Sequence, residues 1–230
     1  MIHRLRGDQP RLHLMLMLAL TFSTGVVDAV GYLGLDRVFT GNMTGNVVIL
    51  GMALTGADDL PIVGPVLALV GFVLGAIVAG RVLRRAPVGW TRRATWLLAV
   101  VAAIIVVSII PVLVGGESPA EPFLFTVTSL LGAAMGMQAG VARHLGVADV
   151  TTVVVTSTLV GLAFESRLGK ANGQKWLRRL SAIVLIAFGA LVGAALLRLG
   201  LVWGIGLAAL ITVFVAVVGH VGAPRGAPTP

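Results

Sequence analysis

Six long stretches almost free of charged residues constrain this chain more than any other feature of its sequence. Each is close to the roughly 20 residues that a helix needs to cross a bilayer. They are residues 13–35, 61–83, 94–114, 122–142, 180–197 and 201–219. Backbone groups in hydrocarbon must be paired internally, and barrel strands would alternate in units of about ten residues. We therefore expect an all-α polytopic membrane protein.

The composition excludes several other classes of protein. Of the residues, 57% are hydrophobic and only 11% are charged, which is far from the range of soluble domains. A formal net charge of +8 would suggest nucleic-acid binding in a soluble protein, but here the basic residues lie between the apolar stretches, where they orient the chain. We expect no nucleic acid as partner. The absence of cysteine excludes disulfides and thiolate metal sites, and we expect no metal and no cofactor.

Two further apolar segments, 41–55 and 150–165, are each about 15 residues long, which is short for a full crossing. If both crossed, nine Lys and Arg residues would lie inside and eight outside. If both enter and return to the side they came from, fifteen lie inside and only Arg37 and Arg198 lie outside. The positive-inside rule thus predicts six spans and two re-entrant or half-helices, with both termini cytoplasmic.

An internal repeat relates the two halves. A shift of 112 positions gives seven identities, which pair Leu33, Gly34, Val38, Thr40, Thr44, Val48 and Leu50 with Leu145, Gly146, Val150, Thr152, Thr156, Val160 and Leu162. We take residues 13–115 as the first repeat and 122–220 as the second, within one membrane domain of residues 1–230. The Pro- and Gly-rich end, 221–230, is expected to be a disordered tail.

Each repeat would contain three full crossings, so the second copy would be inverted in the membrane. Many transporters place their binding site near the midplane between two inverted repeats, where helices are interrupted. This analogy points to the meeting place of the two short segments but names no substrate.

Two motifs resemble a known family. They are TGVVDAVGYLGLDRVFTGNMTGNVVILGMAL, from Thr24 to Leu54, and GMQAGVARHLGVADVTTVVVTSTLVGLA, from Gly136 to Ala163. They resemble the YoaK-like family of bacterial inner-membrane proteins of unknown function. The second motif departs from the first, with Val154 and Thr158 at the places of Asn42 and Asn46. The resemblance implies a multi-pass protein of the bacterial cytoplasmic membrane and supplies no reaction.

Asp28 is the one acidic residue within a predicted full span. A carboxylate there is costly unless it is neutral, paired or hydrated, so such residues are commonly functional. One interpretation is a proton-coupling or cation-binding role. The alternative is that Asp28 caps backbone amides of the first re-entrant turn.

Other polar residues gather at the starts of the two short segments. They are Thr40, Asn42, Thr44 and Asn46 in the first half, with Gln138, Thr152 and Thr156 in the second. Such side chains either line a solute site or only satisfy the re-entrant backbone. Converging helix N-termini would favour an anion, whereas Asp28 favours a cation, so the sign stays open. Arg143 and His144 are interpreted as a cytoplasmic anchor.

Small residues recur four positions apart in Gly71/Gly75, Gly132/Gly136/Gly140 and Gly189/Gly193. Such stripes allow close helix packing, and they would also permit a homo-oligomer. Trp90, Trp96 and Trp176 lie beside basic loops and fit interfacial anchors.

The leading functional hypothesis is a small-solute transporter or channel, with proton coupling through Asp28 as one of its forms, and with membrane lipids and an unnamed solute or ion as partners. A membrane scaffold or assembly subunit is the alternative. A lipid-acting enzyme has little support, because none of the usual catalytic motifs is present and the histidines are not grouped. We therefore expect no enzymatic activity.

Overall fold

The computed structural model describes residues 9–116, 120–146, 155–166, 168–170 and 176–223, and within these ranges all regular structure is helical. Six helical stretches are long and apolar enough to cross a membrane. They are α2 (Gln9–Gly34), α4 (Val63–Leu83), α5 with α6 (Arg92–Val107 and Ile109–Gly115), α7 (Glu121–Leu145), α9 (Trp176–Leu197) and α10 (Leu201–Gly222). The predicted six-span, all-α fold is thereby confirmed. Each predicted span agrees with a helix within a few residues.

Three shorter features complete the fold. α3 (Met43–Ala53) and α8 (Val155–Phe164) are apolar helices too short to cross, and η1 (Ala57–Asp59) is a 3-10 turn before α4. The third span is interrupted at Ser108, because Pro111 lacks the N–H that would bond to the carbonyl of Val107. α10 extends to Gly222, two residues into the segment predicted as a tail, and residues 224–230 lie outside the described part.

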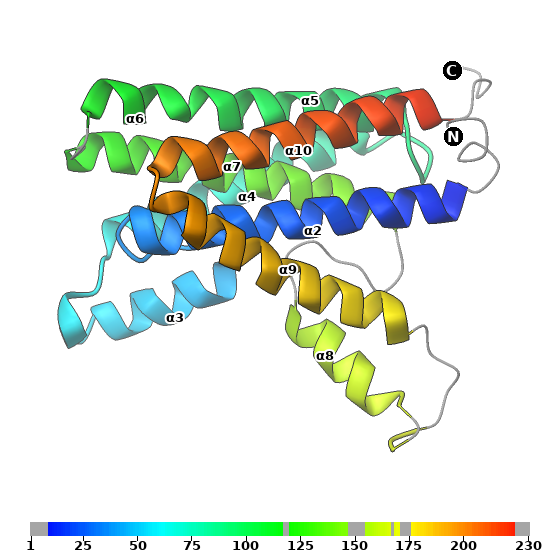
Figure 1. The fold of residues 1–230 in the computed structure, drawn as a ribbon, viewed down its shortest axis with the longest axis horizontal. Helices are drawn as coiled ribbons and strands as arrows, with labels where there is room; N and C mark the ends of the chain where they lie inside the picture. The colour runs from blue at the N-terminus through cyan, green and yellow to red at the C-terminus, as the bar shows by residue number, and fades with distance from the viewer. Residues whose placement is uncertain (1–8, 117–119, 147–154, 167, 171–175, 224–230) are drawn as a thin grey trace.

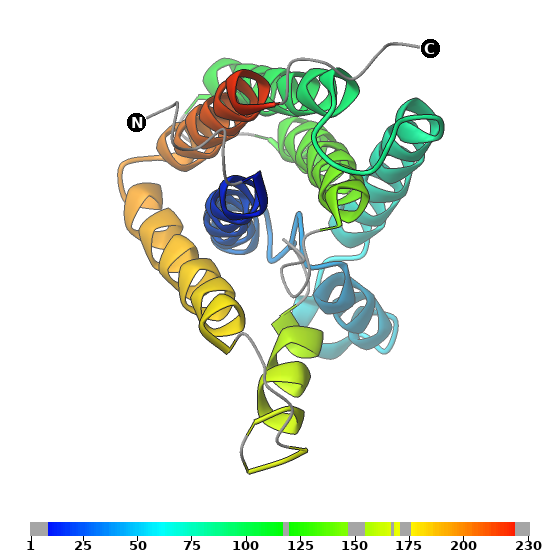
Figure 2. The same ribbon diagram turned by 90° about the vertical axis from the view of Figure 1, so that its right-hand side faces the viewer.

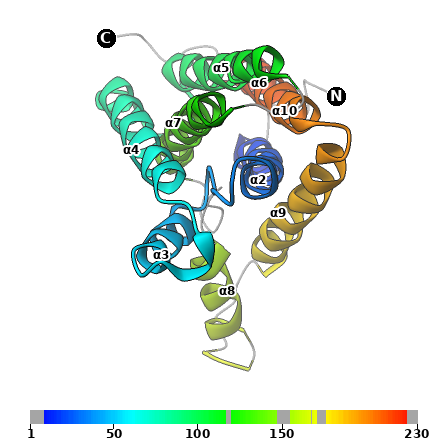
Figure 3. The same ribbon diagram turned by 90° about the vertical axis from the view of Figure 1, so that its left-hand side faces the viewer.

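α2 is the central helix of the bundle. Figures 2 and 3, which show the bundle from its two ends, place α7, α10 and α9 around it, with α3 and α8 on the remaining side. The most apolar window of α2 is 67% buried within the protein, more than that of any other span. Since α2 also carries Asp28, this residue lies near the middle of the molecule in cross-section.

The predicted glycine stripes pack helices of the same chain against one another. A side chain at Gly75 would meet the backbone of Ala133 on α7, and one at Gly136 would meet the backbone of Phe72 on α4. Gly189 on α9 contacts the backbone of Phe22 on α2 in the same way. These faces are therefore covered, and the predicted pairing of two chains would need another surface.

Basic residues concentrate at one end of the bundle, which we call the basic end. Of the twelve Lys and Arg residues in the described ranges, ten lie there, and Arg37 and Arg198 lie at the opposite end. Figure 1 shows the start of α2 and the end of α10 together at this end, where Gln9 Nε2 donates to the carbonyl of Gly222 at 2.8 Å. This asymmetry agrees with the charge pattern from which the topology was predicted.

One predicted interfacial anchor lies inside the fold instead. Trp90 is only 7% exposed, and its ring lies beside that of His13, tilted by 31° with centroids 5.8 Å apart. The indole N–H donates to Thr95 Oγ1 at 2.9 Å. The neighbouring basic loop correctly predicted the end of the bundle at which Trp90 lies. It did not predict that the ring would point into the fold.

The two short helices extend toward opposite ends of the bundle (Figure 1). α3 starts beside the middle of the bundle and extends toward the end at which α2 stops and α4 begins. α8 starts at a similar depth and extends toward the basic end, where α9 begins. The starts of both short helices therefore lie near each other in the interior.

Candidate functional site

The segment between α2 and α3 folds back against α2. α2 stops in a tight turn in which Asp36 and Arg37 have positive φ angles of 60° and 58°. The returning chain then lies directly on Gly31, where an added side chain would meet the carbonyl oxygen of Val38. Absence of a side chain at Gly31 therefore allows the chain to return alongside α2.

Asp28 fixes the place at which α3 begins. Its Oδ1 accepts hydrogen bonds from the backbone N–H groups of Thr40, Gly41 and Asn42, at 3.0, 2.6 and 3.3 Å. A carboxylate is an acceptor-only group and suits three converging donors. The capping role that the sequence offered for Asp28 is thus present. Within the described part of the chain, Oδ2 accepts no hydrogen bond.

The two asparagines of the motif also bond to the backbone. Asn42 is the N-cap of α3, and its Oδ1 accepts from the N–H of Gly45 at 3.2 Å. Asn46 is fully buried, and its amide accepts from the N–H of Phe39 at 2.9 Å and donates to the carbonyl of Phe39 at 2.6 Å. Asn46 therefore holds the returning segment on α3, and it does not line the cavity described next.

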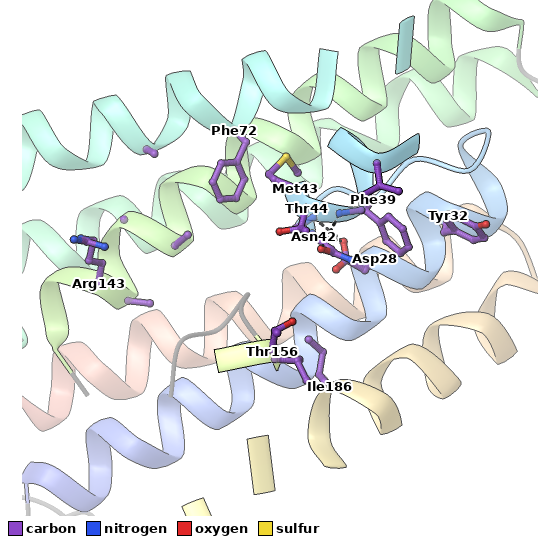
Figure 4. A pocket seen from close by; sticks show the side chains of 18 of the residues that line it. Asp28, Tyr32, Phe39, Asn42, Met43, Thr44, Phe72, Arg143, Thr156 and Ile186 are labelled. Carbon is purple, nitrogen blue, oxygen red and sulfur yellow. Dashed lines mark hydrogen bonds between the residues drawn. The ribbon is translucent and has the colours of Figure 1, made fainter. Parts of the chain in front are cut away.

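A cavity of about 1070 Å³ joins the starts of the two short helices. Figure 4 shows Asp28, Asn42 and Thr44 on one side and Thr156 of α8 on another. Most of the remaining wall is apolar and includes Phe39, Phe72 and Ile186. The structure thereby brings four of the predicted site residues from both halves of the chain to one cavity.

The other predicted site residues lie elsewhere. Thr40 is fully buried, and its hydroxyl has no hydrogen-bond partner among the residues that the structure describes. Gln138 is buried between α7 and α2, where its Nε2 donates to Thr24 Oγ1 at 3.1 Å. Neither side chain forms part of the cavity wall. Thr152 lies outside the described residues.

Several wall residues were not predicted as site residues. Arg143 lines the cavity, and Figure 4 shows it well separated from Asp28. Tyr32 and Phe39, whose rings stack with centroids 4.8 Å apart, flank Asp28 on its other side. Helical spacing of Tyr32 from Asp28, four positions apart on one face, was a usable signal. His144, interpreted from the sequence as part of a cytoplasmic anchor, has its Nε2 3.0 Å from the carbonyl oxygen of Pro87.

The distance between Asp28 and Arg143 along the bundle follows from helix geometry. Thr24 and Gln138 are in contact, and α2 and α7 run in opposite directions. Asp28 is farther along α2 and Arg143 farther along α7, so roughly 13 Å separates them along the axis at 1.5 Å per residue. The wall thus has a carboxylate deep inside and a guanidinium toward the basic end.

Arg179 of α9 bonds to two residues of α8. Arg179 is 8% exposed, and its Nη1 donates to the carbonyl of Gly161 at 2.6 Å and to Glu165 Oε2 at 2.8 Å. Among the described helices, α8 contacts α9 alone. Arg179 therefore helps to hold α8, which carries Thr156 at its other end, against α9.

Comparison with known proteins places the chain in a family. The model of a family described as "Protein of unknown function (DUF1275)" matches residues 16–218. The chain belongs to this DUF1275 family. The "UPF0700 transmembrane protein YoaK" of Bacillus subtilis (strain 168) is 33% identical over 187 residues, which cover 78% of this chain and 81% of that protein.

This result confirms the resemblance inferred from the two sequence motifs, and it agrees with a multi-pass membrane protein. The match covers α3, α8 and Asp28, so the whole cavity belongs to the DUF1275 region. No solved structure matches the chain.

Proposed function

We propose that this DUF1275 protein is a transporter or channel for a small solute that binds in the cavity between α3 and α8. The observation that carries the proposal is the cavity itself. It is bounded by the starts of both short helices and by Asp28, whose Oδ2 accepts no hydrogen bond from the described residues. An ionisable side chain inside a membrane span is energetically costly, so such residues commonly have a function. Interrupted helices that meet in the interior are the usual site architecture of transporters.

The cavity favours a solute with a positive or hydrogen-bond-donating group and an apolar body. The backbone N–H groups before α3 already bond to Asp28, so they are not free to bind an anion. Asp28 Oδ2 can instead accept a bond from an ammonium group or hold a proton. The rings of Tyr32, Phe39 and Phe72 would contact the apolar part and can attract a cation through their faces.

The size of the cavity agrees with an organic solute. Its volume of about 1070 Å³ is slightly above the roughly 300–1000 Å³ typical of small-molecule sites. A channel for a bare ion would need a narrower and more polar path. We therefore favour transport of a small amine over ion conduction.

We further propose how the protein is oriented in the membrane and that its two halves form an inverted repeat. With the basic end in the cytoplasm of a bacterial cell, the Arg143 side of the cavity would face inward and both termini would be cytoplasmic. The opposite directions of α3 and α8, and the matching glycine contacts of α4 with α7 and of α2 with α9, support an inverted repeat. No enzymatic step is proposed, since the described cavity wall contains no His, Lys or Cys.

The test is binding by purified protein. A panel of small organic amines, inorganic cations and organic acids is added, and the unfolding temperature is measured. We expect at least one amine to raise the unfolding temperature by binding the folded state. Asp28→Asn, which keeps an Oδ1 acceptor for the three N–H groups but removes the charge, should abolish the response.

Two further variants make the result specific. Asp59→Asn removes an exposed carboxylate from the turn before α4 and should respond like the natural protein. Thr156→Val, which removes one hydroxyl from the α8 side, should weaken the response even if Asp28→Asn folds poorly. A panel without any response, or a response unchanged in both cavity variants, would contradict the proposal.

A further inference from the structure

A second, smaller hollow lies on the outside of the bundle at its basic end. This α5–α10 groove has a volume of about 310 Å³ and is lined by Arg92, Thr95, Trp96, Ala99 and His220. It is separate from the cavity and shares no residue with it. Because α5 and α10 both belong to spans, the groove faces the lipid.

The groove has a rigid inner wall. Trp90 lies against Gly219 of α10, where an added side chain would overlap its ring. The indole N–H of Trp90 bonds to Thr95 Oγ1 at 2.9 Å, and Thr95 is one of the groove residues. The wall is thus fixed by packing and by a hydrogen bond, and the groove is formed before any ligand arrives.

Two nitrogen-bearing side chains meet at the rim of the groove. Arg92 begins α5, and His220 lies in the last turn of α10. Both are exposed, and neither has a hydrogen-bond or ion-pair partner within the described part of the chain. Among the described residues, the one acid at this end of the bundle is Glu165, and it pairs with Arg179 and not with Arg92 or His220.

Below the rim the groove is apolar. Trp96 and Ala99 follow Arg92 on the same face of α5, and Trp96 is 68% exposed. A tryptophan one turn inside a basic helix end lies at the depth of the lipid headgroups and glycerol backbone. A charged rim above an apolar trough matches the two parts of a phospholipid.

We propose that the α5–α10 groove binds an anionic phospholipid of the adjacent leaflet. The phosphate would lie between Arg92 and His220, and one acyl chain would follow Trp96 and Ala99. Basic pockets between spans recognise lipid headgroups through such charge complementarity. This site is independent of the solute cavity, so either proposal can fail without the other.

The test is native mass spectrometry of the full chain, released from detergent with phosphatidylglycerol or phosphatidylcholine. We expect retention of phosphatidylglycerol in preference to phosphatidylcholine. Arg92→Gln should weaken phosphatidylglycerol binding about fivefold, since one basic residue near the surface contributes about 1 kcal/mol. Arg85→Gln is the matched control, because it removes an equal charge from an exposed position outside the groove and should leave binding unchanged.

A second variant tests the trough rather than the charge. Ala99→Trp fills the groove, leaves the rim intact and should reduce phosphatidylglycerol binding as well. Equal retention of both lipids, an equal loss in Arg85→Gln, or no loss in Ala99→Trp would overturn the proposal. Displacement of the lipid by inorganic phosphate alone would also overturn it, because the site would then recognise a free anion.

Discussion

At the scale of single residues, the two carboxylate oxygens of Asp28 differ in their surroundings. One carboxylate oxygen stabilises the backbone before α3, and the other has no partner in the described part of the chain. Sequence reasoning treated capping and function as alternatives for this residue. The geometry allows both, because a carboxylate has two oxygens.

The approach of Asp28 to the turn depends on Gly41. A side chain there would lie 3.0 Å from Thr24 Cγ2 and 3.3 Å from Asp28 Oδ1, which is tighter than ordinary contact. Gly41→Ala should therefore lower the free energy of unfolding by about 1–3 kcal/mol through overpacking. Thermal unfolding in detergent measures the change.

Gly51 provides the matched control for that prediction. It lies within α3, the helix that begins two residues after Gly41, and nothing is within 4 Å of an added side chain there. Gly51→Ala should be neutral or stabilise by up to about 1 kcal/mol, since alanine favours helix. Equal destabilisation by both substitutions would show that the close contact at Gly41 is not the cause.

The alternating Thr and Asn set shows how far residue-level prediction extended. The set does begin α3, and Asn42 caps it as the residue type suggested. The direction in which each side chain points could not be predicted. Helical spacing placed Asn46 on the same helix face as Asn42. Asn46 instead bonds to Phe39, seven positions earlier in a segment whose return path the pattern does not reveal.

At the scale of elements, the two short helices are held in different ways. α3 is fixed at its start by Asp28 and packs on α4, whereas α8 is held near its end by Arg179 and contacts α9 alone among the described helices. α8 therefore has the smaller set of contacts to lose. It is the better candidate for the element that moves when a solute enters or leaves.

Removal of the Arg179 side chain should loosen α8. Arg179→Met would break bonds to Gly161 and Glu165, and a hydrogen bond to a charged group typically contributes about 1.5–3 kcal/mol. Amide hydrogens of α8 should then exchange faster, while those of α3 keep their protection. Hydrogen exchange with mass spectrometry makes this comparison within one sample.

Arg178→Met is the control, because Arg178 precedes Arg179 on the same helix and has no partner in the described ranges. It should leave exchange in α8 unchanged. If Arg178→Met and Arg179→Met accelerate exchange equally, the loss of basic charge near α8 is responsible and not the specific bonds.

The element boundaries were the most predictable part of the structure. Long apolar runs fix the spans because the bilayer sets their length, and the glycine stripes were correctly interpreted as packing faces. Which helices pack against those stripes was not predictable, since a row of glycines does not indicate which helix will contact it. Gly189 joins α9 to α2, more than 160 positions earlier in the chain.

At the scale of the whole molecule, the charge asymmetry and the proposed repeat predicted that the two short helices would meet, and the cavity lies between their starts. The distribution of Lys and Arg residues favoured six spans over eight, and the six-span count is confirmed. Arg143 could not be placed in the cavity wall from its sequence, because a basic residue after a span is equally expected to be an anchor. The width of the cavity depends on how the helices pack, and it likewise could not be predicted from the sequence.

The central claim is that water-filled space reaches the starts of both short helices. Because the chain has no natural cysteine, single cysteines can be labelled without background. Thr44→Cys and Thr156→Cys place thiols on the cavity wall, and Val70→Cys places one on the exposed outer face of α4. Membranes containing each variant are treated with a small, charged methanethiosulfonate reagent.

We expect the thiols at positions 44 and 156 to react, and the thiol at position 70 to be protected by lipid. A solute identified by its effect on unfolding temperature should slow both reactions. If the thiols at 44 and 156 are as unreactive as the one at 70 in the folded protein, the two short helices do not meet at a hydrated cavity, and the account is wrong.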